Sequence, residues 1–210
     1  MDKLFAIFDM DGTLIDSMIF WKNLASEYLS SKGVKQIPED ILERIKPMTM
    51  SESAALFQQE FGLNGDPEAE MNAMMDEHYR NDIPLKPGVR EYLQMLHNRG
   101  VRMCVASATA EPLMESCLTR LGVRDCFDFL ISCETVGAGK RSPRVYQESA
   151  KRLHAAPEDV AVYEDALYAL QTAKAAGYYV VGVYDDSAAK NWQTIEEIAD
   201  EVILHWEETV

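Results

Sequence analysis

Positive charge is scarce in this chain. Its 210 residues include 20 lysines and arginines against 35 aspartates and glutamates, which gives a formal net charge of −15. A surface of that sign repels phosphate backbones and anionic lipids, so we expect neither nucleic acid nor a membrane among its partners. A small anion can still bind where a metal ion and a lysine reverse the sign locally.

Long apolar runs and paired cysteines are missing as well. The first apolar run, residues 4–8, stops at Asp9, and no later run approaches the roughly 20 residues that cross a bilayer. We therefore expect neither a signal peptide nor a transmembrane helix. The four cysteines show no CxxC spacing and lie in or near apolar segments, which predicts buried, reduced thiols and a cytoplasmic location.

Short apolar runs alternate with helical patterns over most of the chain. These runs predict strands at residues 4–8, 101–106, 127–132, 160–163, 178–184 and 201–204. Helical patterns separate the later runs, an order typical of a parallel sheet with helices on both faces. The predicted fold class is α/β, with a Rossmann-like parallel sheet.

One segment departs from this alternation. Residues 16–82 carry four helical patterns and no convincing strand, and Ser51 is placed to cap the third of them. We expect a core of residues 1–15 and 83–210, interrupted after its first strand by an all-helical cap of residues 16–82. The prolines within residues 83–88 predict a stiff return to the core.

Polar residues gather where the predicted strands end. Four strand ends supply Asp9 with Asp11, Ser107 to Thr109, the Gly139-Lys140 loop, and Glu164-Asp165. In a parallel sheet these ends share one edge, where ligands bind. Two carboxylates as close as Asp9 and Asp11 are costly unless a cation or a proton relieves them. Their oxygens suit a divalent cation, while Lys140, Ser107 and backbone amides suit a phosphoryl group.

Each of these signals is weak on its own. A DxDG sequence can be an acidic turn, and a serine before a helix is usually a cap. Glu164 and Asp165 can be first-turn acids favoured by the helix dipole. Their convergence on one predicted edge favours a functional site over these structural explanations.

Four motifs in this order resemble those of haloacid dehalogenase-superfamily hydrolases with a helical cap after the first strand. They are DMDGTLIDS at 9–17, VASA at 105–108, GKRSPRVY at 139–146 and YEDALYALQTAKAAG at 163–177. The resemblance covers essentially the whole chain, which is similar to the phosphoglycolate phosphatase and beta-phosphoglucomutase relatives. It implies a core of the haloacid dehalogenase-like fold and an enzyme that hydrolyses phosphomonoesters.

The resemblance implies catalytic roles for four residues. Asp9 would attack the phosphoryl group and carry it as an aspartyl phosphate. Asp11 would protonate the leaving oxygen and then activate water, because one aspartate cannot attack and donate a proton at once. Ser107 would hydrogen-bond the phosphoryl oxygens, and Lys140 would pair with Asp9 and the phosphate.

The resemblance also implies a metal site and a phosphate cradle. Mg²⁺ would be held by the Asp9 carboxylate, the Asp11 backbone carbonyl and Asp165, with Glu164 as a possible outer helper. The implied phosphate-binding set is Gly12, Thr13, Ser107, Ala108 and Lys140. Metal and lysine are needed because a carboxylate is a weak nucleophile toward an anion.

Several positions depart from the family pattern. Trp21 and Met50 stand where mutase-like relatives carry a cap histidine and a cap arginine, which weakens a mutase interpretation. Arg141 replaces a usual proline and Arg144 a common aspartate, so the Lys140 loop is expected to be shaped differently. None of these changes removes a catalytic group.

The expected function is a Mg²⁺-dependent phosphatase acting on a small phosphorylated metabolite such as a sugar phosphate, as a monomer or small homo-oligomer. One alternative is a mutase that returns the phosphoryl group to the sugar. A more distant alternative is a phospho-accepting signalling domain, which also combines acids, a hydroxyl and a lysine on a parallel sheet. Such receivers lack a helical insertion, whereas residues 16–82 form one in the predicted arrangement.

Overall fold

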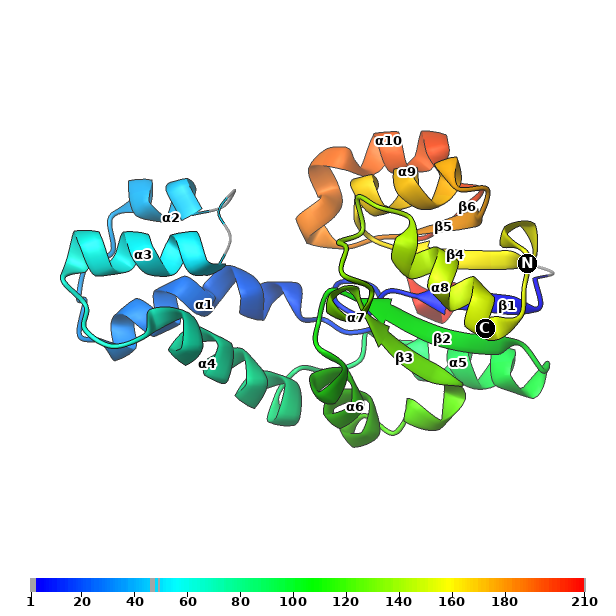
Figure 1. Ribbon diagram of the computed structural model, residues 1–210, viewed down its shortest axis with the longest axis horizontal. Helices are drawn as coiled ribbons and strands as arrows, with labels where there is room; N and C mark the ends of the chain where they lie inside the picture. The colour runs from blue at the N-terminus through cyan, green and yellow to red at the C-terminus, as the bar shows by residue number, and fades with distance from the viewer. Residues whose placement is uncertain (1–2, 46–47, 49, 210) are drawn as a thin grey trace. The chain divides into compact units, whose positions relative to one another are not determined.

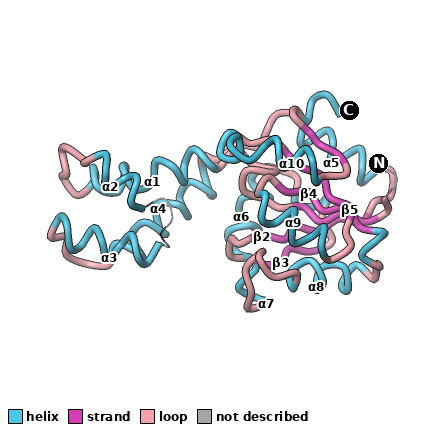
Figure 2. Tube along the Cα trace, turned by 90° about the horizontal axis from the view of Figure 1, so that it is seen from above, coloured by secondary structure: helices cyan, strands magenta, loops and turns pink. Residues whose placement is uncertain are grey.

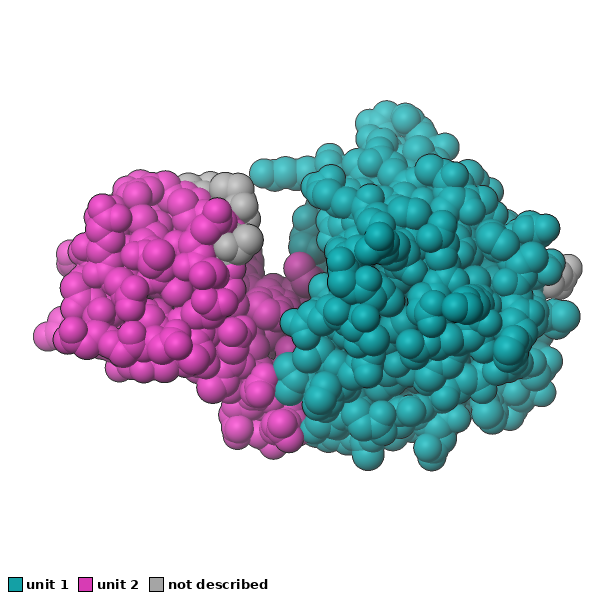
Figure 3. Space-filling view, in the orientation of Figure 1, with its two compact units in different colours: residues 1–17, 83–210 teal, residues 18–82 magenta. Residues whose placement is uncertain are grey.

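The computed structural model describes residues 3–45, 48 and 50–209. The chain divides into two compact units, Met1–Ser17 with Ile83–Val210, and Met18–Asp82 (Figure 3). We call them the sheet unit and the helical unit. The role of the helical unit as a cap stays a prediction.

The sheet unit is built on six parallel strands in the order β3-β2-β1-β4-β5-β6 (Figure 1). They are β1 (Phe5–Phe8), β2 (Arg102–Ser107), β3 (Phe129–Ser132), β4 (Val160–Glu164), β5 (Tyr179–Val183) and β6 (Glu201–Ile203). Each overlaps a predicted run, which confirms the α/β fold class. All five residues of β4 are buried, and such two-sided burial explains why the runs are apolar without alternation.

Helices lie on both faces of this sheet (Figure 2). They are α5 (Val89–Asn98), α6 (Glu111–Arg120), α7 (Cys133–Val136), α8 (Arg144–Leu153), α9 (Leu167–Ala175) and α10 (Trp192–Ile198). Consecutive residues of β1 pack on opposite faces of the sheet. Ile7 packs in a cluster with residues of α8, α9 and α10, whereas Phe8 stacks on Tyr163 with ring centroids 4.2 Å apart, and both contact Trp206.

The C-terminal segment reaches the loop that follows β1. Trp206 begins the short 3₁₀ helix Trp206–Thr209, and its indole Nε1–H donates to the backbone oxygen of Thr13 at 3.2 Å. Gly88 allows this approach, because a Cβ there would lie 2.5 Å from the backbone nitrogen of Glu207. The loop that carries Asp9 is therefore fixed by the far end of the chain.

The helical unit contains α1 (Met18–Ser31), α2 (Glu39–Ile45), α3 (Met50–Phe61) and α4 (Pro67–Asn81). Its buried residues include Tyr28, Phe57, Met71 and Met75, so these methionines fill its core. The side chain of Asp66 caps α4 by accepting the Ala69 N–H at 3.0 Å. Within the described ranges, no helix combines the length and apolar character needed to cross a membrane.

Two local predictions differ from the structure. The prediction that Ser51 caps the third helix is wrong, because α3 begins at Met50 and already contains Ser51. The segment after β3, expected as a loop, begins with the four-residue helix α7. Ser132 caps this helix by accepting a hydrogen bond from the Glu134 N–H at 3.2 Å. A helix of four residues is too short to show a helical periodicity in the sequence, so it was not predicted.

Candidate active site

The strand order places β1 at a switch point of the sheet. The chain passes from β1 to β2 and β3 on one side and then returns to β4 on the other. Phe8 lies opposite both Val105 and Tyr163, and the next N–H, that of Asp9, donates to the Tyr163 oxygen at 2.9 Å. Residues that follow β1, β2 and β4 are thereby brought to one crevice at the carboxyl ends of the strands.

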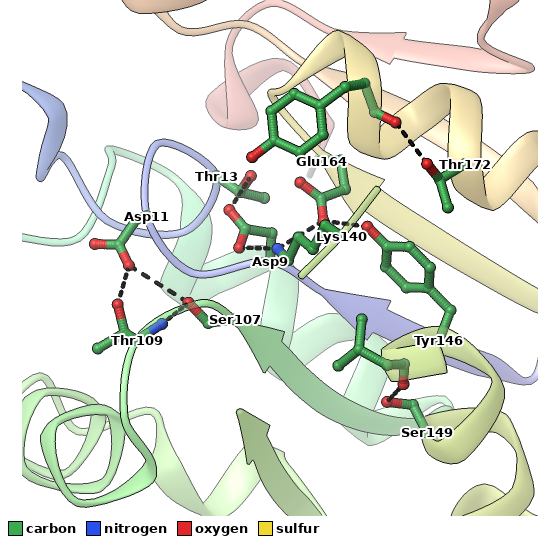
Figure 4. Close-up of polar contacts among 12 residues, drawn as sticks. Asp9, Asp11, Thr13, Ser107, Thr109, Lys140, Tyr146, Ser149, Glu164 and Thr172 are labelled. Carbon is green, nitrogen blue, oxygen red and sulfur yellow. Dashed lines mark hydrogen bonds and ion pairs between the residues drawn. The ribbon is translucent and has the colours of Figure 1, made fainter. Parts of the chain in front are cut away.

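Asp9 lies at the centre of this crevice and is 5% exposed. Its Oδ1 contacts Lys140 Nζ, and its Oδ2 accepts a hydrogen bond from Thr13 Oγ1 at 3.1 Å (Figure 4). Burial raises the pKa of the Asp9 carboxyl, against the opposing effect of the Lys140 charge. Thr13, implied by the resemblance as a phosphate ligand, orients the Asp9 carboxylate in this structure.

Lys140 bridges two carboxylates. Its Nζ lies 2.7 Å from Glu164 Oε1 as well as against Asp9, and it is only 7% exposed. Burial opposes its charge, but Asp9 and Glu164 outweigh burial and hold the pKa of Lys140 above its ordinary value. The ammonium therefore stays protonated and serves as a fixed positive charge beside Asp9.

Tyr146 supports this bridge and was not singled out from the sequence. Its hydroxyl donates to Glu164 Oε1 at 2.8 Å from the buried face of α8 (Figure 4). Glu164 thus accepts from both Lys140 and Tyr146. A phenol on the apolar face of an amphipathic helix needs a hydrogen-bond partner, and that requirement was the available signal.

Three carboxylates of the crevice form a candidate metal site. Oxygens of Asp9, Glu164 and Asp165 lie within 4.8 Å of one another, and all three residues are buried. Burial first, with the neighbouring acids, raises the pKa of Glu164 to about 8 and that of Asp165 to about 7. Three acids carry more negative charge than the Lys140 ammonium can neutralise, and a hard divalent cation with oxygen ligands suits this donor set.

Asp11 belongs to a second cluster beside the first. Its Oδ2 accepts a hydrogen bond from Thr109 Oγ1 at 2.7 Å and lies 3.5 Å from Ser107 Oγ. The Thr109 N–H in turn donates to Ser107 Oγ at 3.1 Å. Figure 4 shows the Asp11 side chain turned toward these two hydroxyls, while Asp9 faces Lys140 and Thr13. The structure therefore brings the predicted Asp11 and Ser107 together and adds Thr109.

Two predicted phosphate contacts are backbone positions. Gly12 adopts a φ of 78°, and its N–H donates to the Ile15 oxygen at 3.1 Å, so in this conformation it shapes the turn after β1. Ala108 lies between Ser107 and Thr109 at the end of β2. The phosphate contacts of both residues stay predictions.

A further ion pair, with one half-buried and one buried partner, lies near Asp165 and was not predicted from the sequence. Lys86 Nζ lies 2.8 Å from Asp185 Oδ2 and donates to the Tyr184 oxygen at 2.9 Å. Burial alone would raise the pKa of Asp185, but Lys86 and Ser187 hold it below its ordinary value. Asp185 follows β5, so the strand-end rule applied to that strand would have found it.

Two aromatic residues of α1, Phe20 and Trp21, make contacts within the helical unit. Trp21 Nε1 donates to the Tyr79 hydroxyl at 3.2 Å. The rings of Phe20 and His78 have centroids 4.8 Å apart. Both contacts join α1 to α4. They indicate that Phe20 and Trp21 help to pack the helical unit itself. Met50 is the first residue of α3.

Comparisons with known proteins agree on one family. A profile described as haloacid dehalogenase-like hydrolase matches residues 6–183. Hexitol phosphatase B of Escherichia coli K12 is 31% identical over 177 residues, which cover 82% of this chain and 80% of that protein. The phosphorylated carbohydrates phosphatase of Thermotoga maritima is 29% identical over 87% of this chain and 88% of its own.

A solved structure extends the likeness to three dimensions. The crystal structure of a putative beta-phosphoglucomutase from Thermotoga maritima matches with a TM-score of 0.81 and 26% identity. The match covers 97% of this chain and 95% of the other.

Proposed function

The chain belongs to the haloacid dehalogenase-like hydrolases. We propose that it hydrolyses small phosphate esters and that Asp9 accepts the phosphoryl group. The observation that carries this proposal is the Lys140 ammonium seated against Asp9, with Glu164 and Asp165 beside it. A carboxylate can attack a phosphate only where cations neutralise both partners. In this crevice Lys140 and a metal ion held by the acids would supply that positive charge.

The first half of the proposed reaction transfers the phosphoryl group to the enzyme. Asp9 Oδ attacks phosphorus as the ester P–O bond breaks, so an acyl phosphate forms and an alcohol leaves. Asp11 gives its proton to the departing oxygen. Thr13 and Lys140 hold the Asp9 carboxylate in place, and Ser107 donates a hydrogen bond to the phosphoryl oxygens.

The second half returns the enzyme to its starting state. Asp11, now ionised, takes a proton from a water molecule as that water attacks phosphorus. The bond from phosphorus to Asp9 breaks, and inorganic phosphate is released. Splitting the hydrolysis into two steps lowers the barrier that a single attack of water would meet.

The acidic residues fit a Mg²⁺ ion. We propose that Asp9, Asp165 and the backbone carbonyl of Asp11 would hold it, with Glu164 nearby. Bound there, the ion would draw charge from the phosphoryl oxygens and so favour attack by a carboxylate. Residues 18–82 would act as the cap that excludes bulk water and contributes specificity.

A metabolite screen tests this function. Purified protein is expected to release phosphate from sugar or polyol phosphates in the presence of Mg²⁺ and to stop when a chelator is added. The compound classes follow the names of the two curated relatives, which act on phosphorylated carbohydrates and hexitol phosphate. Failure to release phosphate from any ester in a broad panel would contradict the proposal.

The same screen separates hydrolysis from the mutase alternative. Product sugar phosphates are measured in parallel with free phosphate. We expect phosphate release, because Trp21, at the position of the mutase histidine, has its indole N–H committed to Tyr79. Isomerised sugar phosphate without free phosphate would overturn this choice.

Replacing Asp165 with asparagine is expected to stabilise the metal-free protein at high pH. Because burial raises the pKa of Asp165 from 3.8 to about 7, the folded state loses stability as pH rises from the lower value to the higher one, and the full cost is present above pH 7. The asparagine variant avoids this cost, so at pH 8 in chelator it should melt about 5 °C above the wild type. At pH 5 the difference in melting temperature should be clearly smaller, because most of the cost accumulates between pH 5 and pH 7. Differential scanning calorimetry measures both.

Mg²⁺ should reverse the order of the two melting temperatures, so that the wild type becomes the more stable protein. Saturating Mg²⁺ is expected to raise the melting temperature of the wild type and to leave Asp165→Asn nearly unchanged. Asp159→Asn, which alters an exposed acid, serves as the control and should follow the wild type throughout. Equal Mg²⁺ stabilisation of wild type and Asp165→Asn would remove Asp165 from the proposed ligands.

A further inference from the structure

Arg141 occupies an unusual position beside the site. It follows Lys140 directly, is exposed, and its guanidinium carbon lies 4.8 Å from the centroid of the Tyr168 ring. Among the residues that the structure describes, no carboxylate forms an ion pair with it. In a chain with a net charge of −15, an arginine held on an aromatic ring instead of a carboxylate retains its capacity to bind an anion.

Tyr168 links this arginine to the catalytic carboxylates. It lies in the first turn of α9, three residues after Asp165, and is 42% exposed. Burial and then the charge of Glu164 raise the pKa of its hydroxyl, and Asp9 adds to the effect while Lys140 opposes it. The contact with Tyr168 therefore joins Arg141 to the helix that begins directly after Glu164 and Asp165.

The two adjacent cations, Lys140 and Arg141, make different contacts and therefore have different roles. Lys140 is buried and committed to Asp9 and Glu164, so its charge serves the reacting group. Arg141 lies outside that bridge and presents a planar guanidinium, which recognises carboxylate and phosphate oxygens in pairs. Stacking on Tyr168 restrains its rotamers, so less entropy is lost when it binds an anion.

We propose that Arg141, held by Tyr168, is a specificity-determining residue that binds a second anionic group on the part of the substrate that is not transferred. This inference rests on the proposed phosphatase function and narrows its substrate class. The preferred phosphomonoesters carry a carboxylate or another phosphate besides the phosphoryl group that Asp9 accepts. A neutral polyol phosphate lacks a partner for Arg141 and is a poorer substrate.

Matched substrate pairs test this inference. Carboxyalkyl phosphates with one, two and three methylenes are compared with alkyl phosphates of the same length, in Mg²⁺ and at low salt. At the best chain length, wild-type kcat/KM is expected to favour the carboxylate by about tenfold, the effect of one charge-assisted hydrogen-bonded pair. In Arg141→Gln the ratio should fall to near one.

Three variants show whether the effect is specific to this pair. Arg144→Gln removes an exposed arginine three positions further on and should keep the wild-type ratio. Tyr168→Phe keeps the ring and should keep the ratio, whereas Tyr168→Leu should lower it. Equal losses in Arg141→Gln and Arg144→Gln would indicate only the general field of the surface, and would overturn the inference.

Two further outcomes would also overturn it. One is a wild type that shows no preference for the carboxylate at any chain length. The other is an Arg141→Gln variant that loses both series by the same factor, because that result assigns Arg141 to positioning the Lys140 loop. If neither series is hydrolysed, the inference is decided by calorimetric binding, whereas the proposed function is decided by the broad metabolite panel. Tighter binding of the carboxyalkyl phosphate that depends on Arg141 supports it, and equal binding overturns it.

Discussion

Asp9→Asn is expected to lower kcat for phosphomonoester hydrolysis by on the order of 10⁴-fold or more. The amide keeps the shape of the side chain but loses the charge that attacks phosphorus. It also removes one of the two ionic partners of Lys140, although Thr13 can still donate to the remaining oxygen. Phosphate release under saturating substrate and Mg²⁺ measures the effect.

Folding and chemistry can be separated in this variant. Its melting temperature at pH 8 in chelator is expected to equal or exceed that of the wild type, because one acid leaves a crowded buried cluster. Asp159→Asn, with its exposed side chain, should retain full activity. Acid-quenched wild type should carry a labile phosphoryl group from labelled substrate, and Asp9→Asn should carry none. Full activity in Asp9→Asn would exclude the mechanism.

The sheet and its polar edge were predictable because both have a local signature. A strand buried on both faces must be a short continuous apolar run, and Asp9, Ser107 and Glu164 each stand directly at the end of such a run. The parallel order then brings those ends together. Sequence reasoning therefore found the acids and the serine without any knowledge of contacts.

The supporting residues were not predictable in the same way. Tyr146 reaches Glu164 from another element, and Lys86 pairs with Asp185 across 99 positions in the sequence. Trp206 contacts the loop after β1 although 193 positions separate it from Thr13. Such pairings depend on register and on helix orientation, which no local pattern encodes. Thr109 and Asp11 were both visible at strand ends, but the hydrogen bond between them was not.

Lys140→Met is expected to lower kcat by about 10³-fold, because it removes the fixed cation beside the attacking carboxylate. Its effect on stability should depend on pH. Lys140 lowers the pKa of Asp9 and of Glu164, although burial still keeps both above their ordinary values. Without it these pKa values rise further, and the cost of ionising two buried acids grows as pH increases. The deficit in unfolding free energy should reach about 3 kcal/mol at pH 8 and be much smaller near pH 5.

Chemical denaturation of the metal-free protein across that pH range measures the deficit. Lys151→Met removes an exposed lysine whose nearest acid is 3.8 Å away, and its effect should be small and independent of pH. Mg²⁺ should restore part of the stability of Lys140→Met, since a divalent ion among Asp9, Glu164 and Asp165 replaces the missing positive charge. It should restore little activity, because the lysine charge lies against one oxygen of Asp9. A deficit that stays constant from pH 5 to pH 8 would mean that Lys140 stabilises the protein by packing, and that the three acids ionise independently of it.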